Sequence, residues 1–321
     1  MTSVRQPGES ELERRIDLFG TEVRLLVGAP TPRRAPGNQV AVLAVEQLLR
    51  RHHALLTRFD SDSELSRLNA DPREEVPISA VLAGALRAAL NAAELTDGLV
   101  DPGLLGQLER AGYGSSRVGV APADLREALL QAPPRSPARR REGAAWHAVE
   151  VGEGFVRRPP GMRFDLGGSA KGHAAESAAA CLRGYDSFAV DVGGDIVVGG
   201  NAGAPRVVVV EHPLGHHDLS FRLGRGAIAT SGLARRIWRT PDGFAHHLID
   251  PSTGEPAWTG VVQATAVAPT AVEAEALAKA ALLSGPDAGL RILQRGGGVI
   301  VLDNGTVRLA GPATQAVRSA A

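Results

Sequence analysis

The sequence predicts an α+β fold in which helices pack on an antiparallel-rich sheet. Two patterns carry this prediction. In the second half, short β-rich runs are joined by tight turns, as in FAVDVGGDIVVGG (188–200), which is typical of a hairpin. Longer stretches such as 39–57 have apolar residues at helical spacing, so that one face of a helix can cover the sheet.

The first half is expected to mix helices with irregular segments. In chain order the expected elements are a flexible arm over 1–15, a strand over 18–27, a helix over 39–57, a short helix within 59–71, a helix over 79–95, a glycine-rich irregular stretch over 98–120, a short helix over 124–131 and an exposed, proline-broken basic linker over 133–143.

The second half is expected to hold most of the sheet. Its elements are a helix over 169–184, the hairpin of 188–200, strands in VVVVEH, LSFRLG and GAIATSG, a strand end and turn in HLIDPSTG, a strand in VVQATAVAP, a helix over 270–285 and a closing hairpin with Asn304-Gly305 at its turn. We expect one domain over 16–315 and a C-terminal tail over 316–321. Thr270 and Glu273 form a capping box for the last long helix, and Gly285 suits its C-terminal cap.

Composition excludes several classes of protein. The 321 residues hold 35 basic and 35 acidic side chains, so net charge attracts neither nucleic acid nor an anionic membrane, and 4% aromatic residues argue against a stacking platform for single strands. One cysteine, Cys181, excludes an internal disulfide and a multi-thiolate metal site. The polar N-terminus lacks an apolar signal region, and no stretch is long enough to span a membrane, which predicts a cytoplasmic protein that is not an integral membrane protein.

The chain has only two lysines, Lys171 and Lys279. All other basic residues are arginine, so we interpret these two as positions that need a compact ammonium on a flexible stem. Lys171 lies in DLGGSAKGH (165–173), where a helix start attracts anions and the lysine could reach a phosphate. The alternative is an ordinary helix start, capped by Ser169 or Asp165.

Lys279 lies four residues after Glu275, on the same face of one helix. The pair is either a surface ion pair worth about 0.3–0.5 kcal/mol or a carboxylate that holds a hard cation with an ammonium beside it.

Three further segments carry polar groups. HHLIDPSTG (246–254) offers histidines and an aspartate for orienting a phosphate or for acid–base work, or else an ordinary Asp-Pro turn. In VDVGGDI, turn chemistry accounts for the two glycines, so a function for Asp191 or Asp195 is the less favoured interpretation. Ser231 and Gly232 are expected to form a turn that presents a hydroxyl and backbone N–H groups.

Taken together, these segments resemble the FAD:protein FMN transferase family, the ApbE-like flavin transferases. The resemblance runs from FGTEV (19–23) to the helix that ends at Gly285 and rests on motifs in one order: FDSDSELSRLN, DGLVDPGLLGQLERAGYG, DLGGSAKGHAAE, VDVGGDIVVGG, ATSG, HLIDPSTG and AEALAKAAL. It implies an ApbE-like, T-fold-related architecture.

The resemblance also implies phosphoryl transfer. A Thr or Ser hydroxyl of an acceptor protein attacks the FMN-side phosphorus of FAD, AMP leaves, and Mg²⁺ neutralises the pyrophosphate. The FAD-contacting positions implied for this chain are Phe19, Phe59, Asp101, Asp165, Lys171, Ser231, His247, Ile249 and Lys279. Asn69 matches a family position that affects transfer. Glu275 and His247 are the candidates for taking the hydroxyl proton.

The chain departs from the family at the implied metal site. That site uses a backbone carbonyl, here of Gly168, with an Asp and a Thr four residues later, where this chain has Glu275 and Lys279. Either Lys279 holds the pyrophosphate in place of the metal, or it points away and Mg²⁺ binds Glu275 with a water in place of the Thr hydroxyl. Two alternative functions stay open: an FAD-binding protein that stores or senses flavin, and a metal-dependent FAD pyrophosphatase that releases FMN and AMP.

Overall fold

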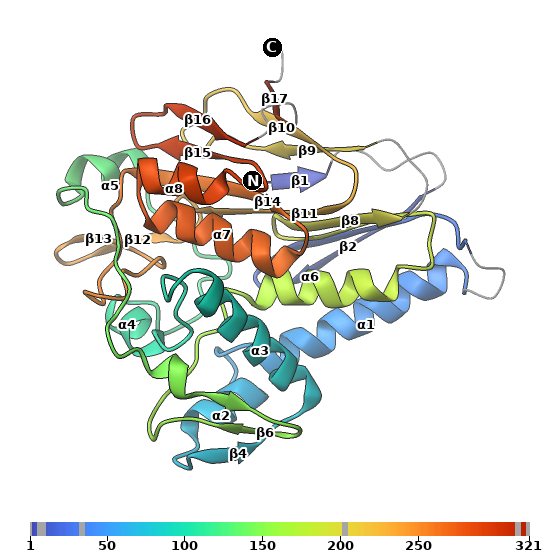
Figure 1. Ribbon diagram of the computed structural model, residues 1–321, viewed down its shortest axis with the longest axis horizontal. Coiled ribbons are helices and arrows are strands. Elements are labelled where there is room, and N and C mark those ends of the chain that lie inside the picture. Colours follow the sequence, from blue (N-terminus) through green and yellow to red (C-terminus); the bar gives the residue numbers. More distant parts are fainter. Residues whose placement is uncertain (1, 5–10, 32–35, 201–204, 312–315, 319–321) are drawn as a thin grey trace.

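The computed structural model describes residues 2–4, 11–31, 36–200, 205–311 and 316–318 (Figure 1). An antiparallel sheet lies at its centre, with the strand order β16-β15-β14-β11-β8-β7-β3-β2. Its strands are β2 (Leu12–Leu18), β3 (Thr21–Val27), β7 (Ser187–Val192), β8 (Asp195–Gly200), β11 (Gly226–Gly232), β14 (Val261–Ala268), β15 (Gly298–Leu302) and β16 (Val307–Ala310). This mixed helix and antiparallel-sheet architecture confirms the predicted fold class.

A smaller antiparallel sheet covers one face of the central sheet. Its strands, in order, are β1 (Thr2–Val4), β9 (Arg206–Val210), β10 (Leu219–Leu223) and β17 (Ala316–Arg318). The two sheets enclose an apolar layer that includes Ile196 and Ile228 from one and Val208 and Phe221 from the other. Alternation along each strand directs these side chains into one shared core.

Helices cover the opposite face, as Figure 1 shows. They are α1 (Asn38–Leu56), α6 (Ala170–Cys181), α7 (Ala271–Leu283) and α8 (Pro286–Leu293), with α3 (Ala80–Leu95) packed on α6 and α7. Alanine dominates the buried positions of α6 and α7, so these two helices approach each other and the sheet closely.

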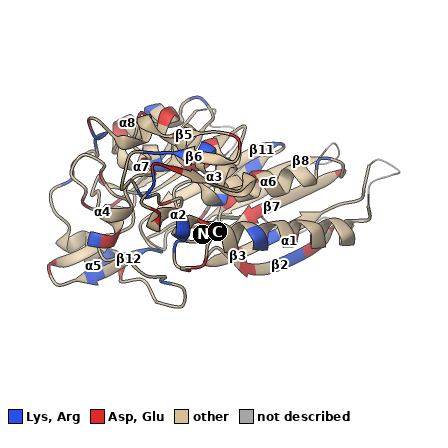
Figure 2. Ribbon diagram, turned by 90° about the horizontal axis from the view of Figure 1, so that it is seen from below, with Lys and Arg blue, Asp and Glu red and all other residues tan. Residues whose placement is uncertain are grey.

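The remaining elements lie below and beside the sheet. They are α2 (Glu64–Ala70), β4 (Glu75–Pro77), α4 (Leu105–Arg110), α5 (Leu125–Gln131), the 3₁₀ turn Ala145–Ala148, β5 (Glu150–Val151), β6 (Phe155–Arg157), β12 (Ile237–Thr240) and β13 (Gly243–His246). Basic and acidic residues are interspersed over the side seen in Figure 2. Among the described residues, no helix combines the length and apolar character needed to cross a bilayer.

The structure corrects the expected ends of the domain. The flexible arm over 1–15 is wrong in part, because Thr2–Val4 pairs with β9 and β2 already begins at Leu12. The strand expected over 18–27 is confirmed as β3 from Thr21 to Val27, but its start is wrong: Phe19 and Gly20 both adopt positive φ (55° and 68°) and turn the chain between β2 and β3. Residues 316–318 of the expected tail pair with β10.

The basic segment 133–143 has no helix or strand, as expected, but it is tied to its surroundings. Arg135 pairs with Asp303, and Arg140 pairs with Asp97. The Ala138 N–H donates to the Leu283 carbonyl, and Ala138 is buried. The segment therefore lies against the domain as an irregular strap.

Arg158 holds the lower part of the molecule together from inside. It is 1% exposed, and its guanidinium donates to the carbonyls of Leu68 (2.7 Å), Asp71 (2.6 Å) and Met162. Leu68 lies in the last turn of α2, Asp71 directly follows that helix, and Met162 lies in the loop after β6, so one side chain ties the end of α2 to that loop.

We predict that Arg158→Met lowers the free energy of unfolding by at least about 2 kcal/mol, because it leaves buried carbonyls without donors. Urea denaturation measures the change. The neighbouring Arg157 forms only exposed pairs with Glu75 and Glu150, so Arg157→Met is the matched control and should leave the midpoint unchanged. Equal midpoints for both variants would contradict the assigned role.

Candidate active site

The two lysines of the chain meet at one buried cluster, which we call the lysine–carboxylate cluster: Lys171, Asp195, Glu275 and Lys279. Lys171 Nζ bonds Asp195 Oδ2 and lies 3.6 Å from Glu275 Oε1, while Lys279 Nζ lies 2.8 Å from the same Glu275 oxygen. Both carboxylate side chains are 1% exposed, whereas the side chain of Lys171 is 21% exposed and that of Lys279 is 10% exposed. The exposed surface of the cluster therefore belongs to the lysine side chains and not to the carboxylates.

Helix α7 supplies two members of the cluster. Thr270 caps its N-terminus by accepting the Glu273 N–H, as the capping box predicts. The helix packs against β11, β14 and α6, so Glu275 and Lys279 face inward. The surface-pair interpretation of Glu275 and Lys279 is therefore wrong, since both residues are buried.

Glu275 also closes the N-terminus of α6. Its Oε2 accepts the Gly172 N–H at 2.9 Å. No residue next to the start of α6 supplies this hydrogen bond. Ser169 makes no side-chain cap bond, and Asp165 accepts the N–H of Gly167 instead, so the predicted capping by either residue is wrong. A carboxylate from another helix thus stabilises the first turn of α6, where the helix dipole favours negative charge.

Gly172 makes this approach possible. A Cβ at residue 172 would lie 2.8 Å from the Ala271 carbonyl oxygen and 2.9 Å from Glu275 Oε2. Only a residue without a side chain lets α6 and α7 meet at this point.

Opposing effects set the charges of the cluster. Burial opposes ionisation of Glu275, but the two lysines outweigh it and lower its pKa to about 2. Burial and the nearby Glu275 raise the pKa of Asp195 to about 7, with Lys171 opposing the rise. Burial also disfavours the charged Lys171, yet Asp195 and Glu275 raise the pKa of its ammonium. Asp195 Oδ1 is buried without a hydrogen-bond partner.

His247 and Arg236 lie next to the cluster. Burial, followed by repulsion from Arg236 and other cations including Lys279, lowers the pKa of His247 well below 6.5, so its imidazole is neutral. Its Nδ1 lies 3.4 Å from the Arg236 carbonyl, which can only accept. The Nδ1 nitrogen therefore carries the proton, and Nε2 is left as an acceptor.

Aromatic rings and arginines form a second group near the site. Arg58 stacks on Phe59 (4.2 Å) and Tyr113 (4.7 Å) and pairs with Asp165 at 2.5 Å. Phe59 is 40% exposed, whereas Tyr113 packs with Trp238. This group offers a flat surface at its exposed end. It also connects Phe59 with Ile249, which is buried in the same apolar cluster as Tyr113.

Asn69 is held entirely by backbone. Its amide donates to the Phe164 carbonyl and accepts the Phe164 N–H, both at 2.8 Å. Asn69 thus positions the segment that leads to Asp165.

The other predicted residues are spread more widely. Phe19 lies at the β2–β3 turn, where its N–H donates to His53. Ser231 lies within strand β11 and is buried, so the turn expected there is wrong. Asp250 organises the HLIDPSTG turn by accepting the N–H groups of Arg139 and Ser252, which matches the ordinary-turn interpretation.

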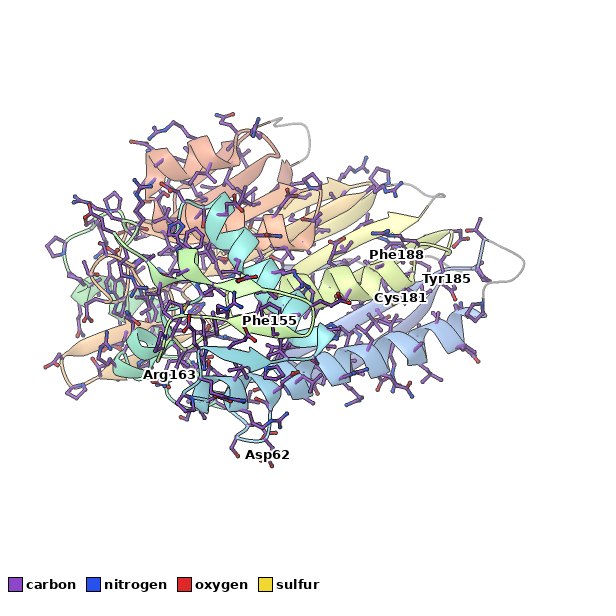
Figure 3. All side chains as sticks on the ribbon, turned by 60° about the horizontal axis from the view of Figure 1, so that its bottom comes forward. Asp62, Phe155, Arg163, Cys181, Tyr185 and Phe188 are labelled. Atoms are coloured by element: carbon purple, nitrogen blue, oxygen red, sulfur yellow. The ribbon has the colours of Figure 1, made fainter. Side chains whose placement is uncertain are left out.

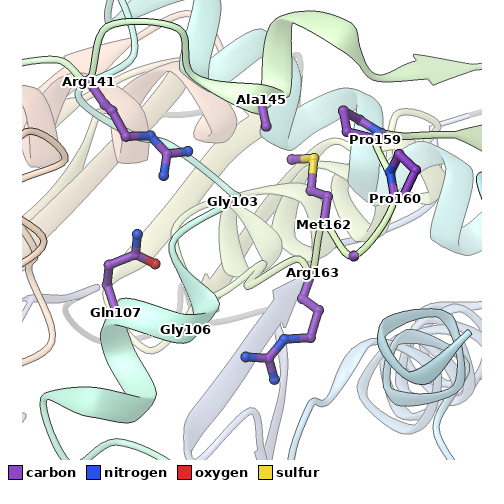
Figure 4. A pocket seen from close by; sticks show the side chains of 10 residues that line it. Gly103, Gly106, Gln107, Arg141, Ala145, Pro159, Pro160, Met162 and Arg163 are labelled. Carbon is purple, nitrogen blue, oxygen red and sulfur yellow. The ribbon is translucent and has the colours of Figure 1, made fainter. Parts of the chain in front are cut away.

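Asp101 lies beside a pocket of about 330 Å³ (Figure 4). Its carboxyl accepts the Gly103 N–H and pairs with Arg141, and burial raises its pKa. Two arginines from different segments line the pocket, together with a glutamine, two prolines and a methionine. The lining residues are Gly103, Gly106, Gln107, Arg141, Ala145, Pro159, Pro160, Gly161, Met162 and Arg163. None of the lysine–carboxylate cluster lines it, so the pocket adjoins the site without containing its charged centre.

The implied Mg²⁺ does not fit the residues present. Both Glu275 oxygens already accept hydrogen bonds, and a protonated Lys279 cannot be a ligand. A Cβ built on Gly168 would lie 3.9 Å from Lys279 Cε, so the lysine does not point away but lies beside the implied metal position. No group of three or more His, Cys, Asp or Glu side chains in the described part of the chain is arranged to hold a metal ion.

The chain belongs to the ApbE family, whose model matches residues 19–302. It is 30% identical to an FAD:protein FMN transferase of Treponema pallidum, covering 93% of this chain and 84% of that protein. It is 27% identical to an FAD:protein FMN transferase of Vibrio cholerae, covering 78% and 75%.

Solved structures agree with this assignment. The ApbE protein of Thermotoga maritima superposes with a TM-score of 0.75 at 27% identity, covering 94% of this chain and 97% of that one. The flavin transferase ApbE of Vibrio cholerae superposes with a TM-score of 0.73 at 22% identity, over 94% and 97%, and supports the fold.

Sequence reasoning underrated Asp195 and missed Arg58, Tyr113 and Arg236 as site residues. Asp195 follows two turn glycines, so the turn explained it. Its available signal was a carboxylate at the start of an otherwise apolar strand, a residue type that is rarely buried without a partner.

We predict that Gly172→Ala separates α6 from α7, because the added methyl group has no room. Thermal unfolding should show a clear loss of stability, and FAD binding should weaken with it. Gly224, where a Cβ would meet nothing within 4 Å, is the matched control. A Gly172→Ala variant as stable as Gly224→Ala would disprove the close approach.

We also predict an acid-sensitive contribution from His246, which is fully buried and has a pKa lowered to about 3 by burial. Below the unfolded pKa of about 6.5, only the unfolded state binds the proton, so stability falls as pH falls from 6.5 toward 3. His246→Leu should reduce the loss of unfolding free energy between pH 7 and 5 by roughly 2 kcal/mol. Denaturation at several pH values measures it, with exposed His217→Leu as control; an unchanged slope would contradict the prediction.

Proposed function

We propose that this chain is an FAD:protein FMN transferase that attaches FMN to a Thr or Ser hydroxyl of an acceptor protein. The observation that carries the proposal is the lysine–carboxylate cluster at the start of α6. Its two lysine side chains are partly exposed, and Arg236 adds a third cation close enough to lower the pKa of His247. Such a group of cations suits a diphosphate, which carries negative charge on each phosphate.

The reaction balances without an external reactant. The acceptor oxygen attacks the FMN-side phosphorus of FAD, a new P–O bond forms, and the P–O bond to the AMP phosphate breaks. AMP leaves with the negative charge of that oxygen, while the hydroxyl proton passes to a base. Lys171 and Lys279 stabilise the charge that builds on the phosphate oxygens. We derive no step through a metal, since the Lys279 ammonium already balances the charge of Glu275 at the implied metal position.

Between the two candidate bases, the geometry favours His247. Glu275 has a pKa lowered to about 2, and its oxygens are engaged, so it is a poor acceptor of protons. The neutral His247 leaves Nε2 as an acceptor for the hydroxyl proton.

The remaining site residues position the flavin and its surroundings. We infer that the exposed face of Phe59, backed by Arg58 and Tyr113, contacts the isoalloxazine ring. Asn69 acts as a positioning residue through Phe164 and Asp165. A cytoplasmic acceptor stays a prediction, which fractionation of host cells followed by flavin fluorescence of separated proteins would test.

Product analysis separates this function from its two alternatives. The purified chain is incubated with FAD and an FMN-acceptor domain, and intact-mass spectrometry follows the acceptor. A transferase adds the mass of an FMN phosphoester and releases AMP in equal amount. Free FMN with AMP would identify a pyrophosphatase, and bound but unchanged FAD with several acceptor domains would identify a binding protein.

We predict that His247→Ala slows transfer by about 10²- to 10⁴-fold, the usual contribution of a general base, while FAD affinity stays within a few-fold of the parent value. Single-turnover measurements of acceptor mass give the rate, and quenching of flavin fluorescence gives the affinity. Exposed His217→Ala is the control. An unchanged rate in the His247 variant would rule out this base.

A further inference from the structure

The lysine–carboxylate cluster contains its own positive charge where a divalent cation is implied. Lys279 Nζ is 2.8 Å from Glu275 Oε1, and its side chain borders Gly168, the second implied ligand. The charge of the carboxylate that would attract Mg²⁺ is therefore already balanced. Mg²⁺ also requires near-octahedral oxygen ligands, whereas both Glu275 oxygens already accept hydrogen bonds, one of them from an ammonium that would repel the cation.

The ammonium nevertheless has capacity for a ligand. A lysine offers three donors, and in the described residues Lys279 spends one of them on Glu275. Its side chain is 10% exposed, and that of Lys171 is 21% exposed, so the lysines and not the carboxylates form the accessible part of the cluster. Glu275 fixes Lys279 from the buried side, which leaves the remaining N–H groups for the ligand.

The use of lysine at this site differs from the use of basic residues in the rest of the chain. Basic residues elsewhere are arginine, and the two lysines lie more than one hundred residues apart in sequence yet share one carboxylate oxygen. A point charge on a flexible stem can move with a phosphate during transfer, which the planar guanidinium does less well.

We propose that the Lys279 ammonium replaces the divalent cation, so that this chain binds the diphosphate of FAD and transfers FMN without a divalent metal. This inference rests on the proposed transferase function. It makes Lys279 a binding residue for the phosphates and leaves Glu275 as the residue that positions it.

The first test measures FAD affinity of the wild-type chain by flavin fluorescence in EDTA and again after adding Mg²⁺. We expect equal affinities and equal transfer rates in both conditions. The electron paramagnetic resonance signal of free Mn²⁺ should also stay unchanged when the protein and FAD are added. Loss of FAD binding in EDTA with recovery in Mg²⁺, or Mn²⁺ uptake, would overturn the inference and leave the proposed function intact.

The second test changes the side chain. Lys279→Met, which removes the charge, should weaken FAD binding in EDTA by about tenfold or more, the value expected for one charge-assisted hydrogen bond. Lys279→Thr should lose affinity similarly in EDTA and regain it with Mg²⁺, since Glu275 is then released from its ammonium. Unchanged affinity in both variants would overturn the inference.

A matched control exists on α1, where Glu46 and Arg50 form another ion pair four residues apart. Arg50→Met removes this pair, in which the other partner of Glu46 is Arg14 and not a residue of the cluster, and should change neither affinity nor metal response.

Thermal unfolding checks that every variant is folded, and Lys279→Arg, which keeps the charge, serves as a second variant if Lys279→Met does not fold. If the wild-type chain binds no FAD in either condition, the proposed function itself fails, which distinguishes that result from failure of this inference.

Discussion

The contact on which the site depends is the one between Glu275 of α7 and the first turn of α6. A single buried carboxylate accepts the Gly172 N–H with one oxygen and attracts both lysine ammonium groups with the other. It thereby fixes the distance between two helices, the charge at the start of α6 and the place of Lys279. The absence of a side chain at Gly172 is the condition for all three.

Stability alone does not explain such a cluster. Removing two carboxylates and two ammonium groups from water is costly, and well-packed apolar side chains of similar size often give equal or greater stability. The cluster lies between alanine-rich helices. The presence of charged groups at this point, with the lysine side chains partly exposed, is therefore best explained by the ligand that the cluster binds.

The sequence predicted the elements whose signals are local. The capping box at Thr270, the Gly193-Gly194 hairpin and the helical spacing of 39–57 all correspond to observed elements. The strand predicted over 18–27 is present from Thr21 to Val27, but its start is wrong because Phe19 takes the left-handed conformation, which its residue type does not indicate. Lys171 and Lys279 were identified through their rarity.

What the sequence could not give is the set of partners. Asp195 enters the site from β8, and Arg58 reaches Asp165 across more than one hundred residues, so only the folded chain brings them together. The turn interpretation accounted for Asp195, so its contact with Lys171 was not predicted. Cys181, the only cysteine, lies exposed at the opposite end of α6 from Lys171 and has no part in the site (Figure 3).

The most direct measurement is a crystal structure of this chain with FAD, grown in the presence of Mn²⁺ and recorded at the manganese absorption edge. Our account predicts the FAD diphosphate within hydrogen-bond distance of Lys171 and Lys279, with no anomalous peak beside Glu275. An anomalous peak that bridges Glu275 and the diphosphate, with Lys279 displaced, would contradict it.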